Sequence, residues 1–414
     1  NIWSQTQTPH TLRKEMAKVL DLPVSAVRVI RMPIGGGFGN RLVMDMKEPI
    51  AALLSKKTKK PVQISNTRQE EFMTARPRYP YSITLKTAVT KEGKILGRQA
   101  TAIVDNGAYS DKGPGTMRET EDINSCLYNI ANTKYDGYIV YTNKQYGTGF
   151  RGFGNPQITF AIESQMDLIA ERLGMDPVKL RMLNLSHRGD VTSSGKKVDT
   201  TSMRETLERA LQKADWYNKR KAYDNQPRDS KKRRGIGLAC MLQSGAGSRG
   251  YGYNSTDAFV KLSEEGQVTV ITPGVEMGQG SRTVVSQIAG EVLGVPLSDI
   301  RVIDNDTDII PYDLGSWGSR TTFVNGLAVK DAAEQAKAEL LEVAGRMFHK
   351  EADQLTIREG KIGPAGEWEK AVSISEVTRY AAYTEGRAIS GKGRFYDPEA
   401  PRFVVTDELM YPTV

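Results

Sequence analysis

The sequence predicts an α+β protein built from two related mixed α/β domains that share one cleft. Two observations carry this prediction: a helix–turn–strand unit occurs twice, and three glycine-rich loops are spread along the chain. At 414 residues the chain exceeds the size at which a single hydrophobic core stops growing, so we expect two domains. We place them at 1–230 and 231–414, with the boundary in a polar segment that runs from about Asn218 to Arg234.

The repeated unit occupies residues 11–30 and again residues 283–303. A shift of 273 positions aligns identical residues in the two copies, including Arg28 with Arg301. Each copy reads as an amphipathic helix, a turn marked by proline and a β-branched strand. The use of one unit twice is what predicts that the two domains are related.

Hydrophobic periodicity predicts two more long helices. One begins at Asn155-Pro156 and stops at Gly174, and the other is the alanine-rich stretch 327–347. Runs of β-branched and aromatic residues predict strands at 83–85, 101–104, 139–141, 258–262 and 268–272, with a hairpin-like turn at 91–93. This mixture of helices and strands supports the α+β class.

Composition and charge narrow the class of function. The net charge is +8, and basic and acidic residues interleave except around 228–234, which we interpret as a solvated linker. That run lacks the interleaved aromatic residues of a nucleic-acid surface, so we expect no nucleic-acid partner. Cys126 and Cys240 are the only cysteines, so the chain holds no disulfide framework, zinc set or iron–sulfur set. No membrane-length apolar run or signal-peptide pattern occurs, and we expect a cytoplasmic protein.

Three glycine-rich loops are the most informative local feature, at 34–40, 149–154 and 275–280. Glycine allows close backbone approach and positive φ angles, so loops this far apart suggest several segments converging on one large anionic cofactor. Neither the P-loop pattern nor the strand-linked dinucleotide fingerprint is present, so an ordinary nucleotide-binding fold does not fit these residues. Gln7 and Gln279 precede the two repeated helices, and facing domains would bring both near that ligand.

Six short motifs follow one another along most of the chain: TQTPH at 6–10, GGGFG at 35–39, DNGAY at 105–109, FRGFG at 150–154, EMGQG at 276–280 and SRTT at 319–322. In this order the chain resembles the molybdenum-binding subunit of the xanthine oxidase family. These molybdenum hydroxylases include aldehyde oxidoreductases, carbon monoxide dehydrogenase, nicotinate dehydrogenase and 4-hydroxybenzoyl-CoA reductase. The resemblance is specific because the motifs share both order and spacing with the family.

The resemblance implies a molybdenum–molybdopterin cofactor, in its cytosine dinucleotide form, bound in the shared cleft. The pterin would hold the metal, so no side chain of this chain is expected as a metal ligand. Gln7 would lie near the apical oxo group, Gly37 and Phe38 over the metal, and Phe153 in the aromatic slot for a flat substrate. The implied catalytic residues are Gln7, Phe38 and Phe153. The implied cofactor-binding residues are Gly36, Gly37, Phe38, Gly39, Arg151, Gly152, Gly278, Gln279, Gly280, Ser316, Ser319 and Thr321.

Each of these residues also has a purely structural interpretation. Gln7 could be a polar residue of a first helical turn, and Phe38 and Phe153 could be core aromatics beneath glycine turns. Arg151 could form a buried ion pair, and residues 319 and 321 could cap the helix that begins near Asn325. Only the order and spacing of the whole set favour the functional interpretation. We interpret Asp306 and Asp308 as turn residues.

The chain departs from the family pattern in two respects. Leu42 stands where purine-oxidising members carry an acidic residue. A second purine-contacting position, an arginine in those members, aligns ambiguously with Arg118 or Glu119. Xanthine is therefore a poor first choice of substrate. The family's general base is a glutamate that follows glycine near the C-terminus. Neither Gly290–Glu291 nor Gly366–Glu367 matches that setting. We therefore expect the second domain to be incomplete at its C-terminal side and a further molybdopterin-domain chain to supply the base.

The implied reaction is a water-derived hydroxylation or oxidation of an aldehyde or N-heteroaromatic carbon of a small molecule. Electrons would pass to an iron–sulfur subunit with [2Fe-2S] clusters and to an FAD subunit, giving a hetero-oligomer without a membrane partner. Two alternatives remain open. A non-catalytic scaffold or maturation protein would hold the cofactor without turnover, and a nucleotide-binding enzyme would bind mononucleotides and release no pterin. The sequence does not identify the substrate or the electron acceptor. It also does not show whether the terminal metal ligand is sulfido or selenido.

Overall fold

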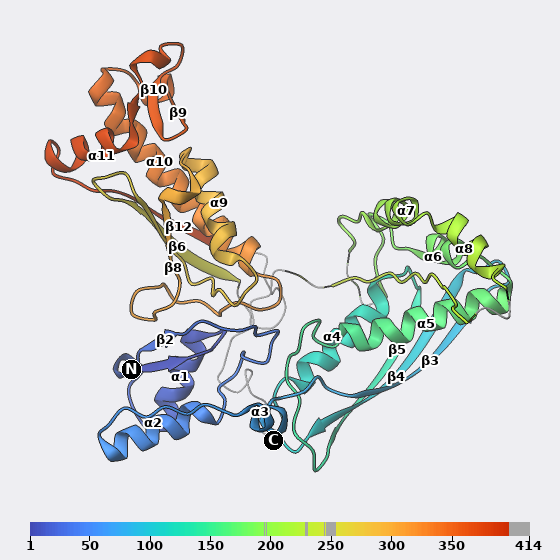
Figure 1. The fold of residues 1–414 in the computed structure, drawn as a ribbon. Helices are drawn as coiled ribbons and strands as arrows, with labels where there is room; N and C mark the ends of the chain where they lie inside the picture. Colours follow the sequence, from blue (N-terminus) through green and yellow to red (C-terminus); the bar gives the residue numbers. More distant parts are fainter. Residues whose placement is uncertain (194, 196, 228–230, 244, 246–253, 397–414) are drawn as a thin grey trace. The chain divides into compact units, whose positions relative to one another are not determined.

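The computed structural model describes residues 1–193, 195, 197–227, 231–243, 245 and 254–396 (Figure 1). The chain forms two compact units. Unit 1 combines Asn1–Met73 with Ser244–Val414, and unit 2 is Thr74–Gln243. This division differs from the sequence division into 1–230 and 231–414, because the first 73 residues pack with the C-terminal part of the chain.

The N-terminal part of unit 1 is a small parallel β-α-β unit. β1 (Ile2–Ser4) pairs in parallel with β2 (Val29–Arg31), and α1 (Pro9–Leu20) with a 3₁₀ turn at Val24–Ala26 connects them. Its core consists of Leu12, Met16, Ala17, Val27 and Val29, which are the apolar positions that the helical and strand periodicities place inward. Two further helices follow, α2 (Lys47–Thr58) and α3 (Arg68–Thr74).

The C-terminal part of unit 1 is built on a four-stranded sheet in the order β12-β6-β7-β8. Its strands are β6 (Ser255–Leu262), β7 (Val268–Ile271), β8 (Ile300–Ile303) and β12 (Ile389–Tyr396). The long helix α10 (Gly326–Phe348) lies along this sheet beside α9 (Ser281–Leu293) (Figure 1). The contact is close because β12 carries glycine there: a Cβ added at Gly393 would lie 2.1 Å from the Ala328 carbonyl oxygen of α10.

The structure confirms that the two repeated segments have one local fold. In the second copy, α9 leads through a 3₁₀ turn at Leu297–Asp299 into β8, which pairs in parallel with β7. Both helices end at a left-handed residue, Asp21 (φ 52°) and Gly294 (φ 66°). Both copies nevertheless lie in unit 1, where Ile30 forms an antiparallel bridge with Asp306. The first copy therefore pairs with the segment that directly follows the second copy, within one compact unit.

A small antiparallel sheet in the order β11-β10-β9 completes unit 1. Its elements are β9 (Leu355–Arg358), β10 (Lys361–Pro364) and β11 (Val372–Ser373), followed by α11 (Ile374–Tyr383). α11 begins with a capping box, in which Ser373 and Glu376 each bond the other's backbone.

Unit 2 is a three-stranded sheet in the order β3-β4-β5 with helices packed against it. Its strands are β3 (Tyr81–Val89), β4 (Ile95–Gly107) and β5 (Asn132–Tyr141). Its helices are α4 (Gly113–Cys126), α5 (Asn155–Leu173), α6 (Pro177–Asn184), α7 (Met203–Ala214) and α8 (Trp216–Asp224). The face of α5 that carries Ile158, Ile162 and Met166 is fully buried in the core of this unit.

The α+β class is confirmed, as are the individual helices and strands. The predicted helices at 155–174 and 327–347 are α5 and α10, and the five predicted strands fall within β3 to β7. The polar segment from Asn218 to Arg234 differs from the prediction, because its first residues belong to α8. Residues 228–230 of the basic run lie outside the described residues, and residues 231–234 are exposed.

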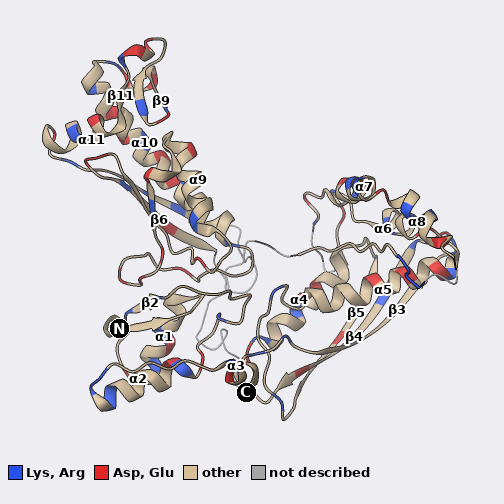
Figure 2. Ribbon diagram, in the orientation of Figure 1, with Lys and Arg blue, Asp and Glu red and all other residues tan. Residues whose placement is uncertain are grey.

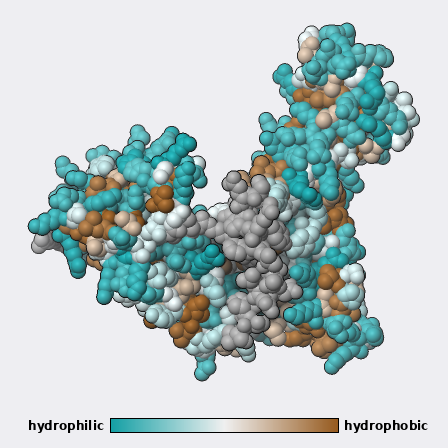
Figure 3. Space-filling view, turned by 180° about the vertical axis from the view of Figure 1, so that it is seen from behind, coloured by the Kyte–Doolittle hydropathy of each residue, from teal (hydrophilic) through white to brown (hydrophobic). Residues whose placement is uncertain are grey.

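The surface carries charges of both signs. Lys and Arg alternate with Asp and Glu along the helices of both units (Figure 2), in agreement with the interleaving seen in the sequence. On the face shown in Figure 3, hydrophilic residues cover most of the surface and hydrophobic residues form separate patches. Within the described residues, no helix is both long and apolar enough to span a bilayer.

Candidate functional site

Gln7 is the centre of the candidate site in unit 1, where it joins two distant loops. The residue is 2% exposed, its backbone N–H donates to the Arg41 carbonyl (2.9 Å), and its carbonyl accepts from the Ser316 N–H (3.0 Å). Its side-chain Nε2 donates to the Ser316 carbonyl (2.8 Å), and Oε1 accepts from the Gly39 N–H (3.0 Å). These partners fix the orientation of the amide, because its oxygen must face the Gly39 N–H. The interpretation of Gln7 as an ordinary first-turn residue does not account for this bridging role.

The loop at residues 35–39 is shaped by close contact with Gln7. A Cβ added at Gly37 would lie 2.5 Å from the Gln7 Oε1 and 2.9 Å from the Met277 Sδ, so any other residue there would displace these side chains. Gly36 and Gly39 adopt φ angles of 107° and 102°. The loop therefore packs buried glycine backbone at Gly37 and Gly39 against the Gln7 amide, while Gly35 and Phe38 are exposed.

Phe38 stands out because it combines backbone strain with exposure. Its φ angle is 53°, in the left-handed region that a bulky residue rarely adopts, and it is 55% exposed. Its interpretation as a core aromatic is therefore wrong. A strained, exposed aromatic ring beside a glycine turn is typical of a ligand-contacting position.

The loop at residues 149–154 in unit 2 repeats this backbone geometry. Phe153 has a φ angle of 48° between Gly152 and Gly154, which both have φ 93°. The Phe153 ring is half-buried and packs over Gly115, where an added Cβ would lie 2.9 Å from the ring. Arg151 is exposed and forms no ion pair with another described residue, so its interpretation as a buried ion pair is wrong. Gln7 and Phe153 belong to different units, and their convergence on one metal stays a prediction.

The loop at residues 275–280 lies in unit 1 and ends at the N-terminus of α9. Gly278 and Gly280 have φ angles of 103° and 84°. The Gln279 side chain bonds its own loop: Oε1 accepts from the Met277 N–H (2.7 Å) and Nε2 donates to the Val275 carbonyl (2.7 Å). Both polar atoms of this amide therefore already contribute to the shape of the loop.

Glu276 caps α9 and is a residue that the sequence analysis missed. Its carboxylate accepts from the N–H groups of Gly278 (2.6 Å) and Arg282 (3.1 Å), among other donors. Burial raises the pKa of Glu276, but these backbone hydrogen bonds outweigh burial and lower it below its usual value. An acidic residue shortly before a helix was the available signal, because the helix N-terminus favours negative charge.

The third predicted group, Ser316, Ser319 and Thr321, lies in the loop that contacts Gln7. Ser316 is fully buried and its hydroxyl donates to the Val275 carbonyl (2.9 Å), while Thr321 donates to the Ser316 hydroxyl (3.0 Å). Ser319 is exposed, with a φ angle of 57°. Of the three, Ser319 presents the hydroxyl most open to a ligand.

A buried ion pair holds this loop in place and was also missed. Arg320 and Asp313 are both fully buried, with an N–O distance of 2.6 Å. Arg320 also donates to the Gly315 carbonyl (3.0 Å), and Asp313 accepts from the Gly315 N–H (2.6 Å). Since Gly315 packs against the Gln7 backbone, this pair fixes the segment to which Gln7 is bonded.

His10 follows Gln7 and is buried in the same region. Its Nε2 lies 2.9 Å from the Pro311 carbonyl, and its ring centre is 5.4 Å from that of Tyr312. Burial lowers the pKa of His10 from its ordinary value of 6.5, against the hydrogen bond to Pro311 and the charge of Asp313, which raise it. The folded protein therefore prefers the neutral imidazole, which donates to the Pro311 carbonyl.

This lowered pKa predicts an acid-sensitive unit 1. The unfolded chain binds a proton at His10 more readily than the folded chain does. The contribution of neutral His10 to stability is therefore complete above pH 6.5, the pKa of histidine in the unfolded chain, and is lost as the pH falls below that value. We expect the loss of Tm between about pH 7 and about pH 5 to be smaller in His10→Gln than in the parent. His187→Gln, which changes an exposed histidine of unit 2, is the control and should keep the parent's pH dependence. An unchanged pH dependence in His10→Gln would contradict the assignment.

Neither glutamate that follows a glycine has the surroundings of a general base. Glu291 is an exposed residue of α9. Glu367 is paired with Lys350 and Lys370, and their hydrogen bonds lower its pKa to about 2. A carboxylate with so low a pKa is a weak base.

The side chains of the described residues do not form a site for a directly bound metal. Among them, no group of three or more His, Cys, Asp or Glu side chains could hold a metal ion. Around Gln7, the structure instead provides glycine backbone, one remaining amide N–H and an exposed aromatic ring. These groups suit a large organic ligand that approaches the backbone closely.

Family models for the molybdopterin cofactor-binding domain match residues 1–185 and 209–411. The chain is 35% identical over 364 residues to the xanthine dehydrogenase molybdenum-binding subunit of Escherichia coli O157:H7, covering 87% of this chain and 48% of that protein. It is 38% identical over 212 residues to the nicotinate dehydrogenase large molybdopterin subunit of Eubacterium barkeri, covering 50% of this chain and 49% of that subunit. The aldehyde oxidoreductase structure from Desulfovibrio desulfuricans ATCC 27774 is similar with a TM-score of 0.78 and 27% identity, covering 96% of this chain and 40% of that one. The chain thus spans about half the length of the curated relatives it matches.

Proposed function

Because the chain belongs to the molybdenum-binding subunits of the xanthine oxidase family, we propose that it forms part of a molybdenum-dependent hydroxylase. The substrate class is an aldehyde or an N-heteroaromatic compound, and the electrons leave through iron–sulfur and FAD subunits. The observation that carries this proposal is the cluster in unit 1 in which the buried Gln7 amide joins Gly39 to Ser316 and packs against glycine backbone.

When bound, the molybdenum–molybdopterin cofactor, which we propose in its cytosine dinucleotide form, supplies a two-electron acceptor and activates an oxygen derived from water. Gln7 has one Nε2 hydrogen left after its bond to Ser316, and this N–H would stabilise negative charge on an oxygen of the bound cofactor. Gly37 would leave that amide undisturbed for the ligand, because a side chain there would displace it, and the exposed Phe38 ring would contact the ligand. Arg151 of unit 2, which is exposed and has no ion pair to the described residues, would contact the pterin.

The proton-accepting glutamate belongs to a further polypeptide segment. Support comes from the surroundings of Glu291 and Glu367 and from the coverage of only about half of each curated relative. Leu42 presents an apolar side chain after the 35–39 loop, which favours substrates with less polar edges than xanthine. Nicotinate and an aromatic aldehyde are therefore the first compounds to assay beside xanthine.

The proposal is tested by turnover in isotopically labelled water. The purified assembly, supplied with an artificial electron acceptor, should place the labelled oxygen in the product. A complex that holds molybdenum but converts none of the assayed aldehydes or heteroaromatics would favour the scaffold or maturation role instead. Mononucleotide binding together with the absence of pterin after denaturation would favour the nucleotide-binding alternative.

Phe153 is expected to act on substrate binding. Replacing its ring with alanine removes aromatic packing of about 1 kcal/mol, which corresponds to a roughly fivefold rise in KM with little change in kcat. Phe160→Ala is the matched control, because Phe160 lies on α5 of the same unit and is 77% exposed. Steady-state kinetics at equal molybdenum content measures both effects. If both constants of Phe153→Ala equalled those of the parent, Phe153 would be a structural residue.

A further inference from the structure

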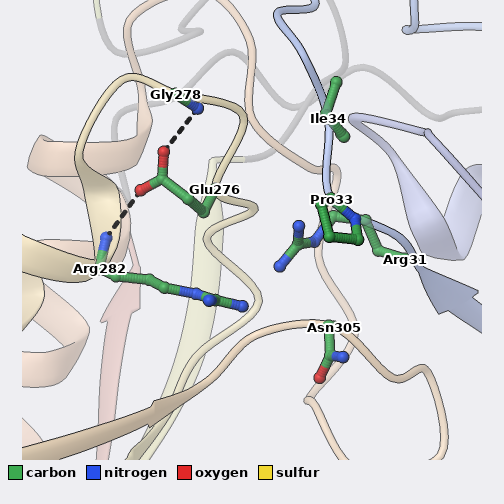
Figure 4. Close-up of a pocket in the computed structure, with 7 residues that line it drawn as sticks. All are labelled: Arg31, Pro33, Ile34, Glu276, Gly278, Arg282 and Asn305. Carbon is green, nitrogen blue, oxygen red and sulfur yellow. Dashed lines mark hydrogen bonds between the residues drawn. The ribbon is translucent and has the colours of Figure 1, made fainter.

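A pocket of about 260 Å³ lies in unit 1 beside two of the glycine loops (Figure 4). Residues 31–34 form one side, and the start of α9 with its preceding loop forms the other. Arg31 and Arg282 reach into it from opposite sides, and Asn305 lines it between them (Figure 4). The pocket thus presents two guanidinium groups and one amide.

Arg31, which lines this pocket, has an unsatisfied donor. The residue is 5% exposed, and its Nη2 donates to Asp304 (2.9 Å) while Nη1 makes a longer contact with the Met32 carbonyl (3.3 Å). Its Nε is buried and has no hydrogen-bond partner in the described structure. A buried N–H of a charged group is costly when unpaired, so it points to a ligand with an acceptor atom.

The two carboxylates near the pocket are already fully engaged. Both oxygens of Asp304 accept hydrogen bonds, from Arg31, from Arg282 and from the Glu276 N–H. Both oxygens of Glu276 accept from its own loop and from the first residues of α9. Neither carboxylate is left to satisfy the Arg31 Nε.

Arg282 supplies the second guanidinium group, and part of this group remains available to bind a ligand. It contacts Asp304 through Nε (3.2 Å) and Nη2 (2.6 Å), and its side chain is 47% exposed. One Asp304 carboxylate therefore bonds two arginines, and the Glu276 carboxylate, which also lines the pocket, balances the second positive charge. The Arg282 Nη1 has no hydrogen bond to a described residue and remains available to a ligand. Guanidinium groups match the spacing of oxygens on a phosphate group.

We propose that this pocket binds a phosphate-type oxyanion through Arg31, Arg282 and Asn305. The volume of about 260 Å³ is several times the roughly 30 Å³ that a water molecule occupies in the liquid. It falls below the roughly 300–1,000 Å³ of sites that enclose a whole small molecule. A phosphate group fits these limits, either as the free ion or at the end of a larger ligand. Gly278, an implied cofactor-binding residue, also lines the pocket, but none of Arg31, Arg282 and Asn305 has a role in the proposed function, so the proposal does not depend on it.

The test is calorimetric titration of the 414-residue chain with inorganic phosphate and, separately, with glycerol 3-phosphate. Saturable binding is expected for the parent, and Arg282→Gln should weaken it about tenfold or more, because charged hydrogen bonds are lost. Arg31→Lys keeps a positive charge beside Asp304 but removes the Nε donor, and it should weaken binding as well. The matched control is Arg301→Gln, which removes an exposed arginine of β8 and should bind as the parent does.

Tighter binding of glycerol 3-phosphate, with the same dependence on Arg282, would support the site and identify a phosphate ester as its ligand. Equal binding of both probes would support the site and identify the free ion. The proposal is overturned if the parent shows no saturable binding of either probe. It is also overturned if Arg301→Gln weakens binding as much as Arg282→Gln, because the attraction would then be due to net charge alone.

Discussion

Gly37→Ala is expected to lower the turnover of the assembled enzyme by roughly a hundredfold while leaving unit 1 folded, because misplacement of a catalytic group by about 1 Å has an effect of that size. The added methyl group would lie 2.5 Å from the Gln7 Oε1 and 2.8 Å from its Cδ. Both contacts are shorter than any real Cβ contact, so the amide must move. The backbone at Gly37 does not have a positive φ angle, which means that alanine strains the contact and not the chain.

Gly35→Ala, which changes the glycine two positions before Gly37, is the control for this variant. Gly35 also has no positive φ angle, and an added Cβ meets nothing within 4 Å. Gly35→Ala should therefore keep the parent's kinetics and Tm. Turnover, Tm and molybdenum content are measured for all three proteins. Equal kcat in the parent and in a fully metallated Gly37→Ala would show that the position of the Gln7 amide does not matter for turnover.

Gln7→Ala tests the same amide by removing it. Loss of one hydrogen bond aimed at developing charge lowers kcat by roughly 10²–10³-fold, whereas KM should change little. The substitution also leaves the Gly39 N–H without its partner, so we expect a stability loss of about 1–3 kcal/mol. Cofactor content must therefore be measured beside the kinetics.

Gln5→Ala is the matched control for the loss of a glutamine side chain. Gln5 lies two residues before Gln7, is exposed and bonds only the Pro33 carbonyl among described partners. Its replacement should leave kcat and KM within the error of the parent. If Gln7→Ala, with full molybdenum content, behaved in the same way as Gln5→Ala, Gln7 would have a structural role alone.

The sequence was sufficient to predict the local fold. Helix α5 and its end at Gly174 follow from apolar periodicity and from a glycine that adopts φ 62°. The repeated unit was visible because identical residues recur at a constant shift, and both copies fold alike. Such features depend on neighbours within a few turns of the chain.

The arrangement of distant segments could not be predicted in the same way. The Gln7 side chain bonds Ser316, 309 positions away, and no local pattern encodes that contact. The ion pair of Asp313 and Arg320 is buried only because the loop between them folds onto the Gln7 segment, so each residue alone reads as a surface charge. For the same reason the packing of residues 1–73 with the C-terminal part was missed.

Some features of the candidate site follow from local sequence, and others depend on contacts between distant segments. The strained backbone of Phe38 and Phe153 agrees with the glycine-rich motifs that predicted special loops there. Gln279 and Ser316, by contrast, use their side-chain polar atoms within the protein, which the motif alone does not reveal. Any contribution of these two residues to cofactor binding would come from the loop shape they stabilise or from their backbone.

We propose that the glycine loops of this chain hold a molybdenum–pterin cofactor on which the chemistry of the assembled enzyme depends. The most direct test is elemental analysis of the purified, active complex combined with fluorescence of the oxidised pterin released on denaturation. We expect molybdenum and pterin in equal amounts, close to one of each per chain. A complex that turns over substrate at full rate while containing neither would contradict it.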